Sequence, residues 1–297
     1  MAALRDIRRR IRSVESTQKI TRAMKLVAAA KLRRAQERLV AARPYASKMA
    51  ELLGNLVTGA DGEAHPLLAE RQGPRRQIVI ITSDRGLAGA FNSNVIRQAL
   101  ALIRESSQPD VTLVVVGRKA RDFYRRRDPW GGRIKRDMVG FWDRLAYTHA
   151  QELADYFMQQ YLDREVDEVH LVYNEFRSVA VQRPVRTQLL PIPSAAHSDR
   201  QGDGAAAADY LYEPSPAAIL GDLLPRHVRT QVFRALMESL AGEYGARMTA
   251  MEAATKNAKD MIEVLTIQYN KARQEKITKE LLDIVGGAEA LKQGSAS

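Results

Sequence analysis

The sequence predicts an α/β protein in which a long antiparallel two-helix coiled coil carries an inserted, small, open α/β domain. Two observations predict this fold. Apolar residues recur at alternating intervals of three and four near both ends of the chain, which is the heptad signature of paired helices. Between the two ends, short apolar runs alternate with amphipathic stretches, which is the pattern of strands and helices in an open sheet.

The first of the paired helices is expected over residues 1–59, followed by a linker over residues 60–76. Two polar residues, Gln18 and Thr21, interrupt its apolar seam, and such residues fix the register of a coiled coil at some cost in stability. Pro44 has no amide donor, so we expect a kink or a break there. The seam comprises Leu4, Ile7, Ile11, Val14, Gln18, Thr21, Met24, Ala28, Leu32, Ala35, Leu39 and Ala42.

The second helix is expected over residues 225–297, beginning at Pro225. A helix of this kind, with about 60 residues, would span roughly 90 Å at 1.5 Å per residue. The apolar residues of its seam are first four positions apart and then alternately three and four positions apart. A long helix with one apolar seam needs a partner helix of similar length to cover that seam. The seam comprises Val228, Val232, Leu236, Leu240, Tyr244, Met248, Met251, Thr255, Ala258, Ile262, Leu265, Tyr269 and Ala272.

Residues 77–193 are expected to form the inserted, Rossmann-like domain. Buried strands are predicted at residues 78–81 and 111–116, two further strands at residues 134–141 and 166–173, and helices at residues 92–105, 118–126 and 147–162. The run at residues 179–190 contains Pro184, which confines it to an edge strand or a bulge. Residues 194–224 are expected to form a mobile loop and the segment that leads into the last helix.

The positive charge of the chain is concentrated on the first helix. The net charge is +11, and residues 1–59 contain fourteen lysines and arginines against four acids, which leaves +10 on that segment. Such a helix would attract nucleic acid, an anionic lipid surface or an acidic protein surface. No aromatic residue precedes Tyr45 among these cations, and no nucleic-acid reading module is apparent, which argues against nucleic acid as a partner.

The sequence gives no grounds for a catalytic residue, a cofactor or a metal. The best enzyme-like stretch is the turn Ser-Asp-Arg-Gly-Leu-Ala-Gly at residues 83–89, which follows a buried strand as phosphate-binding turns do. It fits neither GxGxxG nor GxxxxGK[ST], so a tight turn that needs glycine is the better interpretation. The five histidines lack ligand spacing, there is no cysteine, and no apolar run approaches the roughly 20 residues that span a bilayer.

Several segments of the chain resemble the gamma subunit of F-type ATP synthases. Near the N-terminus, residues 7–43 contain Thr-Gln-Lys-Ile-Thr and Val-Ala-Ala-Ala-Lys. The turn at residues 83–89 and Tyr-Leu-Tyr-Glu-Pro at residues 210–214 also match. At the C-terminus the matching segments are residues 246–258 and residues 269–281, which begin Ala-Arg-Met-Thr-Ala-Met and Tyr-Asn-Lys-Ala-Arg-Gln. The resemblance spans nearly the whole chain and is loosest in the middle domain.

The resemblance implies a non-catalytic rotor shaft without a cofactor. In that family the paired terminal helices stand inside a ring of three alpha and three beta subunits. Proton flow turns a membrane ring of c subunits, and the shaft then drives each beta subunit through binding, synthesis and release of ATP. The implied partners are therefore the alpha, beta and epsilon subunits and the c ring, with no nucleic acid. The implied location is the cytoplasmic face of a bacterial cell membrane, with the membrane contacted only through partner subunits.

The resemblance also implies which residues contact those partners. A basic track that faces acidic lever segments of the beta subunits would contain Lys31, Arg34 and Arg85, with Met24 near the same levers. Contacts with beta higher on the shaft would come from Arg273, Gln274 and Thr278. The foot that rests on the c ring and the epsilon subunit would contain Tyr210, Tyr212 and Glu213.

The chain departs from the family pattern just before its Ala-Arg-Met segment, where Gly242 and Gly245 stand. Two glycines inside a helix cost about 1 kcal/mol each relative to alanine, which would weaken the helix there. Two other functions stay open. A basic coiled-coil tether would show salt-sensitive affinity for polynucleotide or anionic membrane through its first helix. A nucleotide-dependent enzyme using residues 83–89 would show saturable nucleotide binding that Gly86→Val abolishes.

Overall fold

The computed structural model describes residues 2–59, 65–71, 73–105, 110–127, 129–193 and 216–294. The chain divides into two compact units. We call the first, Met1–Val27 with Ala250–Ser297, the terminal unit, and the second, Ala28–Thr249, the central unit. Both units contain part of each long helix, α1 (Ala2–Gly59) and α5 (Pro216–Gly294). The expected class of fold, two long terminal helices with an α/β sheet between them in the sequence, is therefore confirmed.

The central unit contains a mixed five-stranded sheet with the order β3-β2-β1-β4-β5. Its strands are β1 (Arg76–Ile81), β2 (Val111–Val116), β3 (Ile134–Met138), β4 (Glu168–Phe176) and β5 (Gln182–Leu190). The first four strands pair in parallel, and β5 pairs antiparallel with β4 at the edge. The edge position predicted from Pro184 is confirmed, although β5 begins later than expected because Ser178 and Val181 form a turn through two backbone hydrogen bonds.

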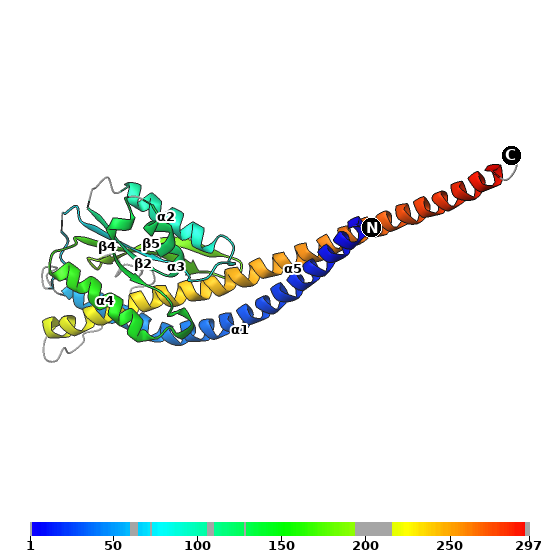
Figure 1. Cartoon of the computed structure of the whole chain (residues 1–297). Coiled ribbons are helices and arrows are strands. Elements are labelled where there is room, and N and C mark those ends of the chain that lie inside the picture. The colour runs from blue at the N-terminus through cyan, green and yellow to red at the C-terminus, as the bar shows by residue number, and fades with distance from the viewer. Residues whose placement is uncertain are drawn as a thin grey trace. The chain divides into compact units, whose positions relative to one another are not determined.

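Helices cover both faces of this sheet, as Figure 1 shows. On one face, Ile78 and Ile80 pack with residues of α2 (Phe91–Glu105) and α3 (Arg118–Arg125). On the other face, Val79 and Ile81 belong to a larger core that includes α4 (Tyr147–Leu162) and the central-unit parts of α1 and α5. The central strands β1 and β2 are buried from both sides, which explains why they read as nearly continuous apolar runs in the sequence.

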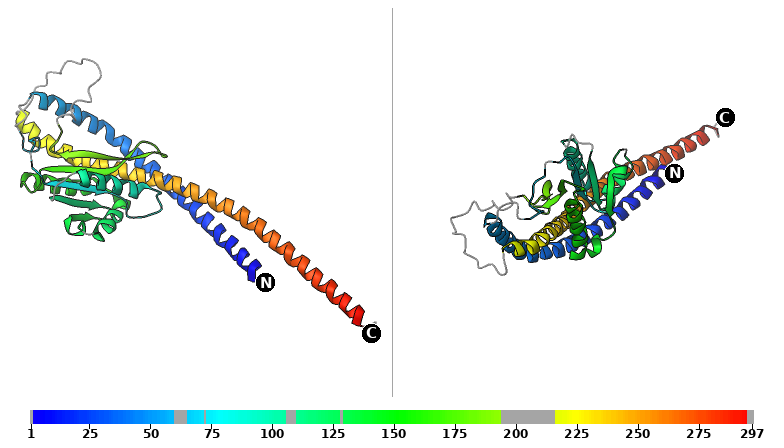
Figure 2. Two further views of the ribbon diagram at one scale, coloured as in Figure 1. Left: turned by 90° about the horizontal axis from the view of Figure 1, so that it is seen from above. Right: turned by 90° about the vertical axis from the view of Figure 1, so that its left-hand side faces the viewer.

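The two long helices lie side by side within the central unit, as Figures 1 and 2 both show. Leu32 and Ala35 of α1 are buried in the same core as Val232 and Leu236 of α5. These residues belong to the two predicted seams, so the periodicity of the sequence correctly identified the faces that pack. Residues 235–245 of α5 are buried on all sides, so this part of the helix is embedded in the core of the central unit.

Each long helix continues through a proline. Helix α5 begins at Pro216, which corrects the expected start at Pro225. Helix α1 runs through Pro44 to Gly59, so of the two outcomes expected at this proline, a kink or a break, the break does not occur. A proline inside a helix removes one hydrogen bond and costs about 3 kcal/mol. Burial of apolar residues before and after Pro225 offsets this cost, since Leu220 and Leu224 are 1% and 0% exposed and Val228 is also 0% exposed.

Two glycines of α5 allow close packing against the sheet domain. A Cβ atom on Gly242 would lie 3.2 Å from Cε2 of Phe91 and 3.4 Å from Cγ of Gln182. A Cβ atom on Gly245 would lie 3.3 Å from both Nε2 of Gln182 and the carbonyl oxygen of Val179. The glycines therefore stand where atoms of neighbouring elements lie close to the helix, and a side chain at either position would need those atoms to shift.

In the terminal unit the two helices pair in antiparallel orientation. Contacts between them join Arg8 to Tyr269 and Lys25 to Glu252, so residue numbers rise along α1 while they fall along α5. On the predicted seam, the hydroxyl oxygens of Thr21 and Thr255 lie 2.8 Å apart. A polar pair within an apolar seam favours one register over its neighbours, because a slip would separate the two hydroxyls.

The described C-terminal part of α5 leaves several apolar side chains exposed. These are Ile277, Leu281, Leu282, Ile284 and Val285, which are 49% to 71% exposed. The seam positions that precede them, including Leu265, Tyr269 and Ala272, are half-buried. The pairing face of α5 therefore ends near Lys276, and the residues after it present their apolar side chains to solvent.

Candidate functional site

Two of the three residues predicted for the basic track converge on one carboxylate. The ammonium of Lys31 donates a hydrogen bond to Asp143 at 2.6 Å, and the Arg85 guanidinium lies 3.4 Å from the other oxygen of the same carboxylate. The hydrogen bond from Lys31 is the main reason that the pKa of Asp143 is lowered, with Arg85 adding to the effect. Arg34 is exposed on α1. We call Lys31, Arg34, Arg85 and Asp143 the charged surface.

Aromatic packing places Asp143 at this position. It lies in a short 3-10 helix (Trp142–Arg144), directly after two buried aromatic residues. The rings of Phe141 and Trp142 stack with centroids 4.8 Å apart, and Phe141 also stacks on His149 at 4.9 Å. Because these rings are held in the core, the carboxylate that follows them is presented outward in a fixed position. Sequence reasoning missed Asp143, since no local motif marks it.

A buried ion pair on α5 lies under the charged surface. The Glu243 carboxylate accepts a hydrogen bond from Arg247, and both side chains are almost completely buried. Burial raises the pKa of Glu243, although the cation of Arg247 opposes the shift. Lys31 reaches this region as well, since its ammonium lies 5.6 Å from the ring centroid of Tyr244, whose pKa burial raises to about 12. Lys31 thus connects the seam to the exposed charges.

In the turn at residues 83–89, the Asp84 carboxylate makes its hydrogen bonds within the protein. One oxygen of Asp84 accepts from the backbone amide of Arg118 at 2.8 Å, and the other accepts from the amide of Gly140 at 2.7 Å. Arg118 is the first residue of α3, so the Asp84 carboxylate joins the turn to the start of α3 and, through Gly140, to the segment that follows β3. The turn therefore fixes α3 to the sheet.

Glycine is required beside this turn. Gly117 has φ +93°, and a Cβ atom there would lie 2.1 Å from the carbonyl oxygen of Thr82. The Thr82 hydroxyl in turn accepts from the amide of Ala120 at 2.9 Å. This close approach joins the ends of β1 and β2 to the start of α3, so the glycine serves packing.

The other predicted contact residues lie in different places. Met24 is a half-buried member of the α1 seam in the terminal unit. Exposed positions on the terminal-unit part of α5 are occupied by Arg273, Gln274 and Thr278. Outside the described residues lie Tyr210, Tyr212 and Glu213, together with the loop expected over residues 194–209.

The described part of the chain contains no group of three or more His, Asp or Glu side chains arranged to hold a metal ion. Within the same residues, no helix combines the length and the apolar character that crossing a membrane requires. The charged surface can make ionic contacts with an acidic partner. Its cationic side chains are accessible, because Arg85 is 71% exposed and Lys31 is 38% exposed.

Comparison with known proteins agrees with this description. The matching family model is described as ATP synthase and covers residues 3–291. An ATP synthase gamma chain from Anaeromyxobacter sp. (strain Fw109-5) is 52% identical over 297 residues, covering 98% of this chain and 100% of that protein. A second gamma chain, from Pelotomaculum thermopropionicum, is 48% identical over 292 residues, again covering 98% of this chain and 100% of that protein.

Solved structures show the same fold. A chain in the central stalk and c ring structure of Tetrahymena thermophila mitochondrial ATP synthase is 26% identical, with a TM-score of 0.59, over 79% of this chain and 99% of that chain. A chain of the Euglena gracilis mitochondrial ATP synthase is 23% identical with a TM-score of 0.68, over 100% of this chain and 97% of that chain. The second likeness supports the fold alone.

The chain has two long paired helices, a small sheet and an exposed charged surface. These features define a structural subunit that contacts other proteins. The sequence comparisons identify the assembly. This chain belongs to the ATP synthase gamma-chain family. It is a non-catalytic rotor subunit of the central stalk.

Proposed function

We propose that this chain couples proton-driven rotation of a membrane c ring to ATP synthesis and hydrolysis in a head of three alpha and three beta subunits. The observation that supports this proposal best is the antiparallel pairing of α1 with α5 in the terminal unit. Paired helices resist bending and twisting better than one helix, and a polar seam contact opposes sliding of one helix along the other. A shaft that transmits torque needs both properties.

We further propose that the basic track (Lys31, Arg34 and Arg85) contacts acidic segments of the beta subunits. These side chains are partly or largely exposed, so each contact would be modest, about 0.2–1 kcal/mol, and tolerant of register. Such contacts would let the shaft pass successive beta subunits without binding tightly to one of them. Met24 would lie near the same beta segments, and the upper contacts with beta would come from Arg273, Gln274 and Thr278.

The remaining contacts are proposed from the family pattern. Residues 194–224 would include the foot on the c ring and the epsilon subunit, with contacts from Tyr210, Tyr212 and Glu213. The named relatives are bacterial, and we therefore place this chain at the cytoplasmic face of a bacterial cell membrane, held there by its partner subunits. The proposed division of the chain is a first helix at 1–59, a linker at 60–76, a domain at 77–193 and a last helix, whose start is moved from the expected residue 225 to Pro216.

Reconstitution with alpha and beta subunits tests the proposal. We expect one copy of this chain to join three of each subunit and ATPase activity to depend on its presence. Charge reversal of the basic track (Lys31→Glu, Arg34→Glu and Arg85→Glu) should change turnover while the particle still assembles. A matched control reverses three exposed arginines of the same unit, Arg97, Arg126 and Arg183, and should leave turnover unchanged.

Asp143 provides a further control, because the glutamates introduced at residues 31 and 85 would repel the Asp143 carboxylate. Adding Asp143→Lys to the triple variant restores opposite charges within the chain but does not restore a basic surface for a partner. If turnover stays altered in this quadruple variant, the contact with beta is responsible. If turnover recovers, the basic track serves only the fold of the chain, and the proposed contact is wrong.

A further inference from the structure

A pocket in the central unit has no role in the proposed shaft. It lies between the loop that precedes β1 and the C-terminal end of α4, and its volume is about 520 Å³. This volume is within the range of about 300–1,000 Å³ that is usual for small-molecule sites. Three arginines and one aspartate supply its charged side chains, and the lining residues are Pro66, Ala69, Arg71, Gly73, Arg75, Arg164 and Asp167.

The only carboxylate among these lining residues is already neutralised. Asp167 accepts two hydrogen bonds from the Arg75 guanidinium, at 2.8 and 3.0 Å, and a third from the Arg75 amide at 3.1 Å. These bonds lower the pKa of Asp167, so it is ionised and paired. Gly73 lets the loop lie against this carboxylate, because a Cβ atom there would be 2.0 Å from Oδ2. Arg71 and Arg164 therefore leave the pocket with an excess of positive charge.

Arg71 is fixed before any ligand arrives. Its guanidinium carbon lies 4.1 Å from the centroid of the Tyr161 ring, and it donates a hydrogen bond to the carbonyl oxygen of Tyr161. The Tyr161 hydroxyl donates to the carbonyl of Ala69 at 2.6 Å, which ties the loop to α4. An immobilised guanidinium binds an anion with less loss of side-chain entropy than a free one.

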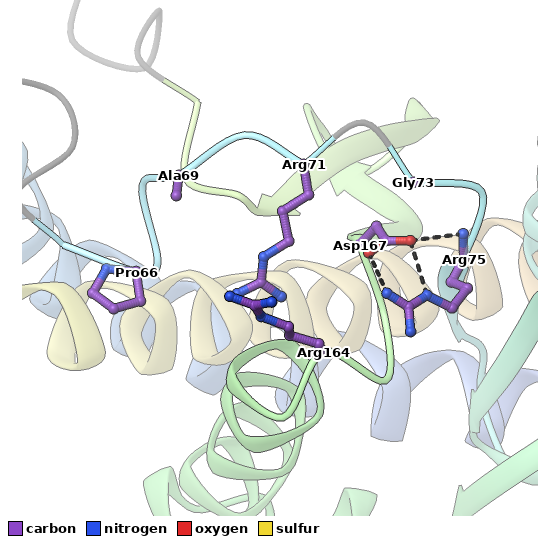
Figure 3. A pocket seen from close by; sticks show the side chains of 7 residues that line it. All are labelled: Pro66, Ala69, Arg71, Gly73, Arg75, Arg164 and Asp167. Carbon is purple, nitrogen blue, oxygen red and sulfur yellow. Dashed lines mark hydrogen bonds and ion pairs between the residues drawn. The ribbon is translucent and has the colours of Figure 1, made fainter.

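Arg164 stands at a position where glycine is the usual residue. It follows the end of α4 with φ +58°, and left-handed backbone of this kind costs an ordinary residue about 1–2 kcal/mol. Arg71 and Arg164 line the same pocket, and their guanidinium groups overlap in the view of Figure 3. Within the part of the chain that the structure describes, neither guanidinium has a carboxylate within ion-pair distance. Two cations that line one pocket without a carboxylate partner form a favourable environment for an anion.

We propose that Arg71 and Arg164 bind the phosphate group of a phosphorylated ligand in this pocket. Guanidinium groups match the geometry of phosphate oxygens and form paired, charge-assisted hydrogen bonds with them. The pocket is larger than one oxyanion, so there is room for the group that carries the phosphate. A soluble phosphate ester and a lipid headgroup present the same chemistry here, and the two are separated by experiment.

The test measures binding to the full-length chain in two arms. The first titrates inorganic phosphate and glycerol phosphate by calorimetry. The second measures cosedimentation with vesicles of phosphatidylcholine that do or do not contain phosphatidylglycerol. Arg164→Gln is compared with Arg183→Gln, which removes the same charge from an exposed arginine of β5 outside the pocket. Arg164→Gly is added because glycine relieves the backbone strain, so thermal unfolding should show an intact fold.

We expect Arg164→Gln and Arg164→Gly to weaken binding by about tenfold or more in at least one arm, while Arg183→Gln leaves it unchanged. A loss confined to the vesicle arm identifies a lipid as the source of the phosphate, and a loss with soluble ligands identifies a free phosphate ester. Equal weakening by Arg164→Gln and Arg183→Gln would mean general attraction to a basic protein. That result, or no saturable binding in either arm, overturns the proposal.

Discussion

Replacing Gly242 by alanine tests whether the glycines of α5 serve packing. Alanine is favoured over glycine in a helix interior by about 1 kcal/mol, so a glycine with free space around it should be improved by the change. Gly221 of the same helix is such a glycine, because nothing lies within 4 Å of the position that a Cβ atom would take there. The two positions therefore share a helix and a substitution but differ in their surroundings.

At Gly242 the surrounding atoms decide whether the change to alanine raises or lowers the free energy of unfolding. A new methyl would lie 3.2 Å from an edge carbon of Phe91, which is only 4% exposed and has little room to move. Overpacking of a filled core costs about 1–3 kcal/mol. After the helix-propensity gain is subtracted, Gly242→Ala should lower the free energy of unfolding by about 1 kcal/mol. Gly221→Ala should raise it by about 1 kcal/mol.

Urea unfolding followed by tryptophan fluorescence is the appropriate assay. Trp130 and Trp142 both lie in the central unit, as do the two glycines, so the signal reports the unit that is perturbed. The expected result is a difference of about 2 kcal/mol between the two variants, with similar dependence on urea concentration. If Gly242→Ala stabilises the chain as much as Gly221→Ala does, close packing does not explain the glycine, and the reasoning is refuted.

Three further predictions concern other contacts of the central unit. Asp143→Asn should change the free energy of unfolding by less than about 1 kcal/mol, because its ion pairs are largely exposed; a larger loss in urea unfolding would contradict this. Asp167→Asn should lower the melting temperature at neutral pH. Since Arg75 depresses the pKa of Asp167, the difference should shrink as the pH falls below about 4, and a difference independent of pH would exclude ion pairing as its cause. Gly117→Ala should destabilise the chain by about 3 kcal/mol or more, because both its positive φ and the clash with a carbonyl oppose a side chain; wild-type stability in urea would refute that.

The fold was predictable because the spacing of apolar residues along the sequence indicates which side chains are buried. Seam positions such as Leu32, Thr21 and Met251 are buried where the spacing placed them, and β2 has the predicted bounds. The start of α5 was not predictable in the same way. Pro225 is a local signal against helix, but the burial of Leu220 in the core overrides it, and that burial depends on contacts that no local pattern contains.

The charged surface was only half predictable. The basic residues of the track were found by resemblance to a family, and the structure brings Lys31 and Arg85 to one carboxylate. Asp143 lies 112 residues from Lys31 and 58 from Arg85 in the sequence, and nothing near it marks its role. The pairing depends on how the aromatic residues before Asp143 pack, so only the tertiary structure reveals it.

The antiparallel pairing of the chain ends has a consequence for biosynthesis. Thr21 and Thr255 meet on the seam although 234 residues separate them. At a synthesis rate of about 5–20 residues per second, the first helix waits roughly 12–47 s for its partner to be made. All five strands are synthesised during that interval, so we expect the sheet to form first and the terminal helices to pair last. Until then the apolar seam of α1 is exposed at the ribosome, and the newly made chain is most vulnerable to aggregation at this stage.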